Sequence, residues 1–230
     1  MARLAAGNPV TIPAAGVNLE GILEVPRGAS GIVLFSHGSG SSKSSPRNTL
    51  VARALNQAGL GTLLMDLLTE EEDRDYARRF DIDLLTQRLA QAVGWLRQQL
   101  QTRDLVIGLF GASTGAASAL RVAALPRDGV RAVVSRGGRP DLAEEALPLV
   151  KAPTLLIVGG EDYRVWELND RAFERLKAEK KLVIIPGATH LFEEPGTLEM
   201  VAREAAVWFK QYLRKAGEED QCRREPGIKY

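Results

Sequence analysis

The chain has 230 residues, of which 45% are hydrophobic, and this is enough for one sizeable core. Its 30 Lys and Arg residues nearly balance its 29 Asp and Glu residues, so the charge does not indicate binding to nucleic acid or to an anionic membrane. The single cysteine, Cys222, excludes an intramolecular disulfide and argues against a thiolate metal site.

The N-terminal residues 1–14 lack the apolar stretch of a secretory signal. No apolar run reaches the roughly 18 residues of a membrane-spanning helix. We therefore expect a soluble, cytoplasmic protein that enters no membrane. The sequence favours neither a monomer nor a homodimer.

The first predicted elements are two strands and a helix. Alternating apolar and polar residues over 17–26 are typical of an antiparallel strand near a sheet edge, and the apolar run at 31–38 is typical of a buried parallel strand. Residues 45–60 predict a helix, because Ser45 can cap it and Pro46 suits its first position.

The rest of the chain continues this alternation. Residues 61–68 predict another buried strand, the charged residues 69–82 a solvated loop or short helix, and residues 83–100 an amphipathic helix. Four strand–helix pairs follow, with predicted strands at 104–111, 130–138, 154–160 and 181–187 and predicted helices at 114–125, 141–147, 168–179 and 197–216. The alternation predicts a mostly parallel sheet with helices on both faces, in one domain over 1–216. The charged tail over 217–230 has no apolar face, and we expect it to be disordered.

The sequence "GASTG", residues 111–115, lies at a predicted strand–helix junction. It fits G-x-S-x-G, in which the glycines allow a tight turn that raises the Oγ of Ser113 above the sheet. The amide of Thr114 then lies at a helix N-terminus, where it can donate to an oxyanion. The alternative is a turn of small residues that only lets the helix pack closely.

A serine nucleophile needs a base and an acid, expected in the order serine, acid, histidine. Of the two histidines, only His190 follows Ser113, so we predict that His190 is the base, unless it is a structural loop histidine. We predict that Asp162, just past a strand, orients His190, with the adjacent Glu161 as the alternative. Asp162 could also simply turn the chain.

The loop "HGSGSSKS", residues 37–44, could cradle either a nucleotide phosphate or an oxyanion. A phosphate-binding P-loop would place glycines where His37 and Ser42 stand, so an NTPase is disfavoured. In a hydrolase this loop supplies the second oxyanion donor, for which we predict the amide of Ser39. Gly38 and Gly40 would leave the backbone open to substrate.

Together, "HGSGSS", "GASTG", "SRGGRPDL", "GGED" and "PGATHLFEEPG" resemble the α/β-hydrolase superfamily, in its dienelactone hydrolase-like branch. The chain is especially similar to the hydrolase domains of that branch that also occur fused to phosphoribosyltransferases. The resemblance implies an α/β-hydrolase fold, no metal or organic cofactor, and a triad of Ser113, Asp162 and His190. Dienelactone hydrolases proper use a cysteine nucleophile, so the serine favours a serine esterase.

Two groups of side chains could select the substrate. Arg136 and Arg139 follow a strand, where they could bind a substrate carboxylate or pair with nearby acids of residues 141–145. Tyr163 and Trp166 could line an acyl pocket or pack in the core. The segment 66–82 is too short for a large cap domain, so we expect an open site.

We therefore predict a carboxylesterase that acts on small-molecule esters. The same triad would also serve a lactone hydrolase, an amide hydrolase or an acyltransferase. A catalytically silent binding domain of the same fold is the non-enzymatic alternative.

Overall fold

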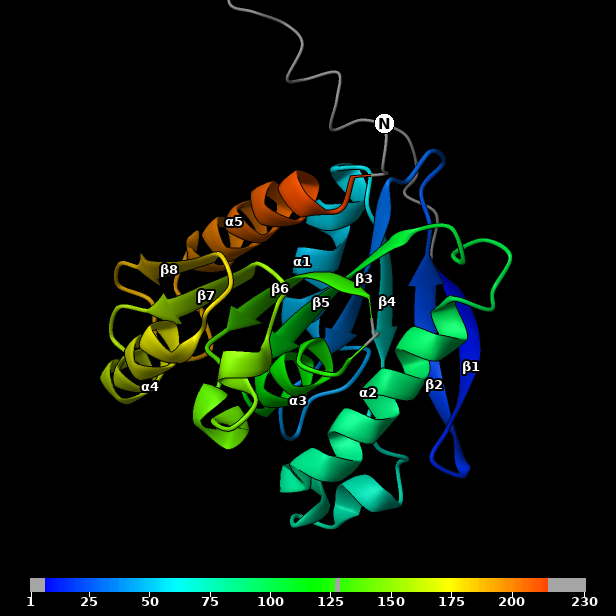
Figure 1. Cartoon of the computed structure of the whole chain (residues 1–230), viewed down its shortest axis with the longest axis horizontal. Helices are drawn as coiled ribbons and strands as arrows, with labels where there is room; N and C mark the ends of the chain where they lie inside the picture. Colours follow the sequence, from blue (N-terminus) through cyan, green and yellow to red (C-terminus); the bar gives the residue numbers. More distant parts are fainter. Residues whose placement is uncertain (1–6, 127–128, 215–230) are drawn as a thin grey trace, which may run out of the picture.

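The computed structural model describes residues 7–126 and 129–214. They form an eight-stranded sheet with helices on both faces (Figure 1). The strands, in spatial order, are β1 (Asn8–Ala14), β2 (Val17–Glu24), β4 (Gly61–Met65), β3 (Gly31–Ser36), β5 (Val106–Ala112), β6 (Val130–Arg136), β7 (Thr154–Gly159) and β8 (Lys180–Ile185). Strands β3 to β8 are parallel, and the β1–β2 hairpin joins the edge of β4 in antiparallel orientation.

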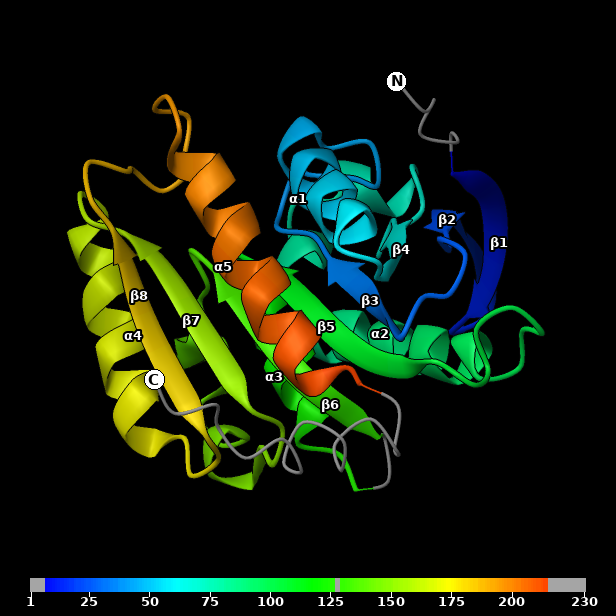
Figure 2. The same cartoon turned by 90° about the horizontal axis from the view of Figure 1, so that it is seen from above.

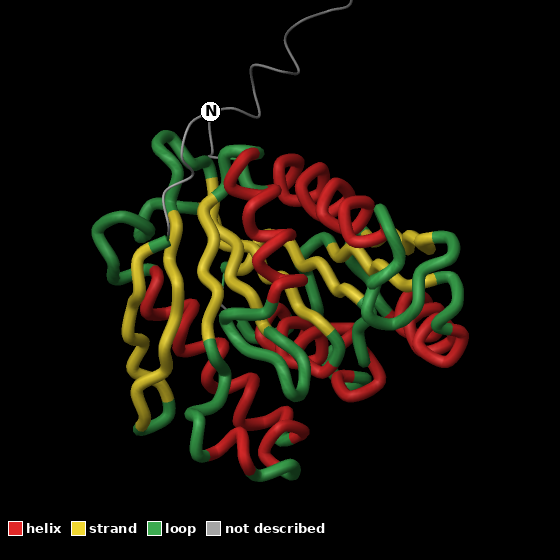
Figure 3. The backbone as a smooth tube through the Cα atoms, turned by 180° about the vertical axis from the view of Figure 1, so that it is seen from behind, coloured by secondary structure: helices red, strands yellow, loops and turns green. Residues whose placement is uncertain are grey.

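Five α-helices cover the sheet in two layers (Figures 2 and 3). They are α1 (Pro46–Gln57), α2 (Ile82–Leu96), α3 (Thr114–Ala123), α4 (Tyr163–Arg175) and α5 (Thr197–Tyr212). Helices α1 and α5 pack on one face through a cluster that includes Val51 and Phe209, and α2, α3 and α4 pack on the other through a cluster that includes Leu89 and Leu120. The sequence prediction of an α/β-hydrolase fold is confirmed.

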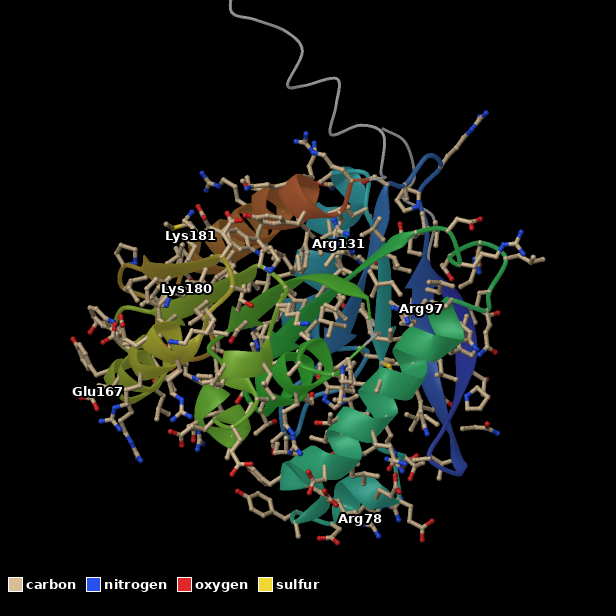
Figure 4. All side chains as sticks on the ribbon, in the orientation of Figure 1. Arg78, Arg97, Arg131, Glu167, Lys180 and Lys181 are labelled. Carbon is tan, nitrogen blue, oxygen red and sulfur yellow. The ribbon has the colours of Figure 1, made fainter. Side chains whose placement is uncertain are left out.

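No large cap domain is present in the described part of the chain. The connection from β4 to α2 contains the short 3₁₀ helices η1 (Glu72–Arg74) and η2 (Arg78–Phe80). Its charged residues 69–81 stay near the surface, as Figure 4 shows for the labelled Arg78.

Local sequence signals explain how α1 begins. The Ser45 Oγ accepts a hydrogen bond from the Asn48 amide at 3.4 Å, and Pro46 occupies the first helical position. This start fixes where the loop between β3 and α1, residues 37–45, meets the helix. We call these residues the β3–α1 loop.

The structure differs from the predicted elements at three places. Strand β1 was not predicted, because its two prolines, Pro9 and Pro13, are tolerated only at a sheet edge such as this one. Helix α4 begins at Tyr163 instead of residue 168 and ends at Arg175. Residues 141–147 form no α-helix; two 3₁₀ turns occupy this region, η3 (Pro140–Ala143) and η4 (Leu147–Leu149).

None of the helices within residues 7–126 and 129–214 is long and apolar enough to cross a membrane. The tail over 217–230, for which disorder was predicted, lies outside the described residues.

Candidate active site

Ser113 lies in a strained turn between the last residue of β5 and the first residue of α3. Its φ is 51° and its ψ −122°, a conformation that non-glycine residues rarely adopt. The Ser113 amide donates to the Arg136 carbonyl at 3.2 Å, and the Ser113 carbonyl accepts from the Arg139 amide at 3.0 Å. The turn after β6 therefore holds the strained residue in place.

The glycines on either side of Ser113 are required by close packing. A Cβ on Gly111 would lie 2.4 Å from the Cα of Ala116, and a Cβ on Gly115 would lie 2.2 Å from the Ser36 carbonyl oxygen. Both distances are far shorter than any real Cβ contact, so a larger residue would displace the backbone. This is the geometry that the sequence predicted for a nucleophile elbow.

His190 and Asp162 are joined by a short hydrogen bond. The His190 Nδ1 lies 2.6 Å from the Asp162 Oδ2, with 14% of the Asp162 side chain exposed and 38% of the His190 side chain exposed. The His190 ring also lies against Gly137, where a Cβ would be 3.5 Å from Nδ1. Ser113 and His190 therefore both border the turn after β6.

Glu161, the alternative acid, points elsewhere. Its carboxylate accepts a hydrogen bond from the Tyr163 hydroxyl at 2.9 Å, and both side chains are exposed. The contacts therefore favour Asp162 as the partner of His190.

The other histidine, His37, fixes the β3–α1 loop. The Leu67 amide donates to its Nε2 at 3.0 Å, so the proton lies on Nδ1, which donates to the Gly38 carbonyl at 2.9 Å. Burial lowers the pKa of His37 and keeps it neutral. His37 is thus a fixed link between this loop and the end of β4.

Gly38 and Gly40 differ in their surroundings. A Cβ on Gly38 would lie 2.9 Å from the Cβ of Ser113, so the absence of a side chain there lets the loop approach the serine. Gly40 has a φ of 69°, and the nearest atom to a Cβ there would be the Arg79 Nη1 at 3.6 Å. No sequence pattern indicated that Arg79 lies beside this loop.

The two predicted oxyanion donors are in direct contact. The Ser39 amide donates to the Thr114 Oγ1 at 3.0 Å, and Thr114 is 2% exposed. Thr114 is the first residue of α3, and an amide at this position has no acceptor within the helix. The Thr114 amide is therefore placed to donate, whereas the Ser39 amide would have to exchange one acceptor for another.

Lys43 is fixed by two acidic residues. Its Nζ lies 2.6 Å from Asp66 and 2.9 Å from Glu20, and its amide also donates to Asp66 at 2.7 Å. An interaction of Lys43 with a nucleotide phosphate would break these ion pairs. In residues 7–126 and 129–214, no group of three or more His, Cys, Asp or Glu side chains is arranged to hold a metal ion.

The two candidate arginines have different environments. Arg139 forms a two-pronged ion pair with Asp141, with distances of 2.8 Å and 2.6 Å, and this hydrogen bonding raises its pKa. Arg136 is buried, and neither its Nε nor its Nη1 has a hydrogen-bond partner. The alternative reading, a structural ion pair, therefore describes Arg139 and not Arg136.

The predicted aromatic side chains lie on the surface. Tyr163 is 63% exposed and Trp166 is 38% exposed, both in the first turn of α4 just after Asp162. Neither is packed in the core. Their exposure does not fit a closed acyl pocket.

Comparison with known proteins assigns the family. The sequence model described as "Dienelactone hydrolase family" matches residues 19–216. The chain belongs to the dienelactone hydrolase family. It is 57% identical to a crystal structure described as a dienelactone hydrolase from Anabaena variabilis, with a TM-score of 0.88, over 90% of this chain and 98% of that one.

Two solved structures of lower sequence identity share the fold. Est1E from Butyrivibrio proteoclasticus has a TM-score of 0.76 at 18% identity, over 90% of this chain and 98% of that one. A Xanthomonas campestris protein described as a serine hydrolase without a lid has a TM-score of 0.74 at 21% identity, over 90% and 95%. At these identities the similarities show a shared fold.

Two curated Mycobacterium tuberculosis relatives carry the name "Putative phosphoribosyl transferase". Each is 57% identical over 204 residues, which are 89% of this chain and 46% of the relative. The chain thus spans about half the length of these relatives. The match agrees with the resemblance to family domains that are fused to phosphoribosyltransferases.

Proposed function

We propose that this chain is a serine hydrolase that cleaves small carboxylic esters through Ser113, His190 and Asp162. The observation that supports this most strongly is the strained Ser113 turn beside a His190 ring that is hydrogen-bonded to Asp162. Strain of this kind persists only where the surrounding structure enforces it, and it is typical of functional sites. Membership of a hydrolase family supports the same conclusion.

In this mechanism Ser113 attacks the ester carbonyl while His190 takes its proton. The carboxylate of Asp162 holds the proton of His190 on Nδ1, so that Nε2 is free to act as the base, and it stabilises the imidazolium that forms. His190 then protonates the leaving alcohol, and water hydrolyses the acyl-enzyme by the reverse sequence of proton transfers.

We assign the oxyanion hole to the amides of Thr114 and Ser39. The Ser39 amide would leave the Thr114 hydroxyl and donate to the oxyanion as negative charge develops there. His37 supports this step because it fixes the Gly38 carbonyl, and with it the peptide that carries the Ser39 amide.

Hydrolysis of p-nitrophenyl esters from acetate to octanoate tests the proposal. We expect turnover by the wild type and its loss, by at least about 10³-fold, in Ser113→Ala. Ser44→Ala is the matched control, because Ser44 is an exposed residue of the β3–α1 loop. Retention of activity in Ser113→Ala would contradict the assignment. Amide analogues and competing alcohols in the same assay separate an esterase from an amidase or an acyltransferase.

A further inference from the structure

Arg136 carries a buried positive charge that nothing in the described part of the chain neutralises. The residue is 8% exposed, and neither Nε nor Nη1 has a hydrogen-bond partner. No salt bridge reaches it from residues 7–126 or 129–214. Burial, together with the charge of Arg47, lowers its pKa to about 10, so the group still carries its charge at neutral pH. An unpaired buried charge is costly for a folded protein.

Two other arginines near Arg136 do have acidic partners. Arg139 pairs with Asp141, and Arg47 pairs with Glu193 at 3.1 Å. Charged side chains far from the site extend into solvent, as Figure 4 shows for the labelled Glu167. Acidic residues are therefore available in this region, yet none of them pairs with Arg136.

Three observations place Arg136 next to the candidate active site. It is the last residue of β6, and its carbonyl accepts the hydrogen bond from the Ser113 amide. Its guanidinium carbon lies 5.9 Å from the centre of the Phe192 ring, two residues after His190. Arg47, whose charge acts on it, lies in the first turn of α1, directly after the β3–α1 loop.

We propose that Arg136 is a binding residue for an anionic group, a carboxylate or a phosphate, carried by the substrate next to its scissile ester. A guanidinium can donate two parallel hydrogen bonds to either group. The ligand would supply the negative charge that no side chain in the described part of the chain provides to Arg136. This inference rests on the proposed hydrolase function and narrows its substrate class.

A binding experiment tests the site without relying on hydrolysis. In Ser113→Ala protein, we would measure the melting temperature with monomethyl succinate, with inorganic phosphate, and with sodium chloride at equal ionic strength. We expect a clear rise with at least one of the two anions relative to chloride, and the larger rise identifies the anion. The rise should disappear when Arg136→Met is added.

Arg121→Met is the matched control, because Arg121 pairs with Asp83 on the surface and its loss removes the same charge. This control should keep the anion-induced rise, and Arg136→Lys should keep part of it. Since Arg136→Met removes an uncompensated buried charge, it should fold at least as stably as its parent without ligand. No rise with either anion, or a rise that persists in Arg136→Met, would overturn the proposal.

Hydrolysis then links the site to catalysis. We would compare monomethyl succinate with the neutral dimethyl succinate in a pH-stat. Arg136→Met should lower kcat/KM for the monoester by about 10- to 100-fold more than kcat/KM for the diester. Equal losses for both esters would overturn the role in selecting an anion. An anion-dependent rise in melting temperature without hydrolysis of either ester would contradict the proposed function and leave the anion site standing.

Discussion

Glu72 and Arg88 provide a quantitative prediction about the segment that supports the site. Arg88 is 1% exposed, and its two terminal nitrogens each lie 2.7 Å from a Glu72 carboxylate oxygen. Arg88 also donates to the Leu67 carbonyl at 2.8 Å. Because the Leu67 amide binds His37, this ion pair anchors the residues behind the β3–α1 loop.

Replacement of Glu72 by Gln would leave the Arg88 charge buried and unpaired. Hydrogen bonding to Arg88 lowers the pKa of Glu72 from 4.5 to about 2. At about 1.4 kcal/mol for each pKa unit, this corresponds to roughly 3 kcal/mol of stability at neutral pH. The loss of one partner from a buried ion pair typically costs about 3–5 kcal/mol, which agrees.

The pH dependence has a definite sign. The folded-state pKa of Glu72 is depressed, so its contribution is fully present well above pH 4.5 and is lost as the pH falls towards about 2. The difference in stability between wild type and Glu72→Gln should therefore shrink to less than half between pH 7 and about pH 3.

Urea unfolding at the two pH values measures this difference. Glu71→Gln is the matched control, because it removes the same charge from an exposed neighbour. We expect Glu71→Gln to stay within about 0.5 kcal/mol of the wild type. If Glu72→Gln is as stable as Glu71→Gln at pH 7, or if its deficit is the same at pH 3, the reasoning is refuted.

Substitutions at three positions test the site itself. Asp162→Asn should lower kcat by about 10³- to 10⁴-fold in the ester assay, because His190 would lose the partner that fixes its tautomer, and a loss below about 10-fold would contradict this role. Ser39→Ala should keep kcat within about 3-fold of the wild type. Ser39→Pro, which lacks the amide proton, should lower kcat by about 10²- to 10³-fold in a protein that circular dichroism shows to be folded. Equal kcat values for the two variants would exclude this amide as a donor. Gly115→Ala should lower the melting temperature because its Cβ would meet a β3 carbonyl at 2.2 Å, and an unchanged melting temperature would show that the turn is not as tight as described.

Local sequence signals were enough to predict the fold, the tight turn at Ser113 and the pairing of His190 with Asp162. The alternating strands and helices indicated a parallel sheet, and G-x-S-x-G at a strand–helix junction indicated the tight turn that the Ser113 φ of 51° confirms. The chain has only two histidines, and their order relative to Ser113 was enough to choose between them. In the structure His190 contacts Asp162, whereas His37 is buried and neutral. Local capping chemistry also placed Ser45 at the start of α1.

Features that depend on where side chains point in the fold could not be predicted. Arg136 and Arg139 are three residues apart, and the sequence alone does not distinguish their roles. Only the fold shows that Arg139 pairs with Asp141 while Arg136 stays unpaired. The contact of the Ser39 amide with Thr114 joins positions 75 residues apart, so no local pattern reports it. The ion pair of Glu72 and Arg88 was missed for the same reason.

The central claim is that Ser113 is an activated nucleophile, and mass spectrometry after treatment with a fluorophosphonate tests it most directly. The account predicts one covalent adduct per chain, on the peptide that contains Ser113, formed by the folded wild type and absent from Ser113→Ala. It also predicts that the adduct forms far more slowly in His190→Ala. A folded wild type that remains unlabelled, or a label on another serine, would contradict the account.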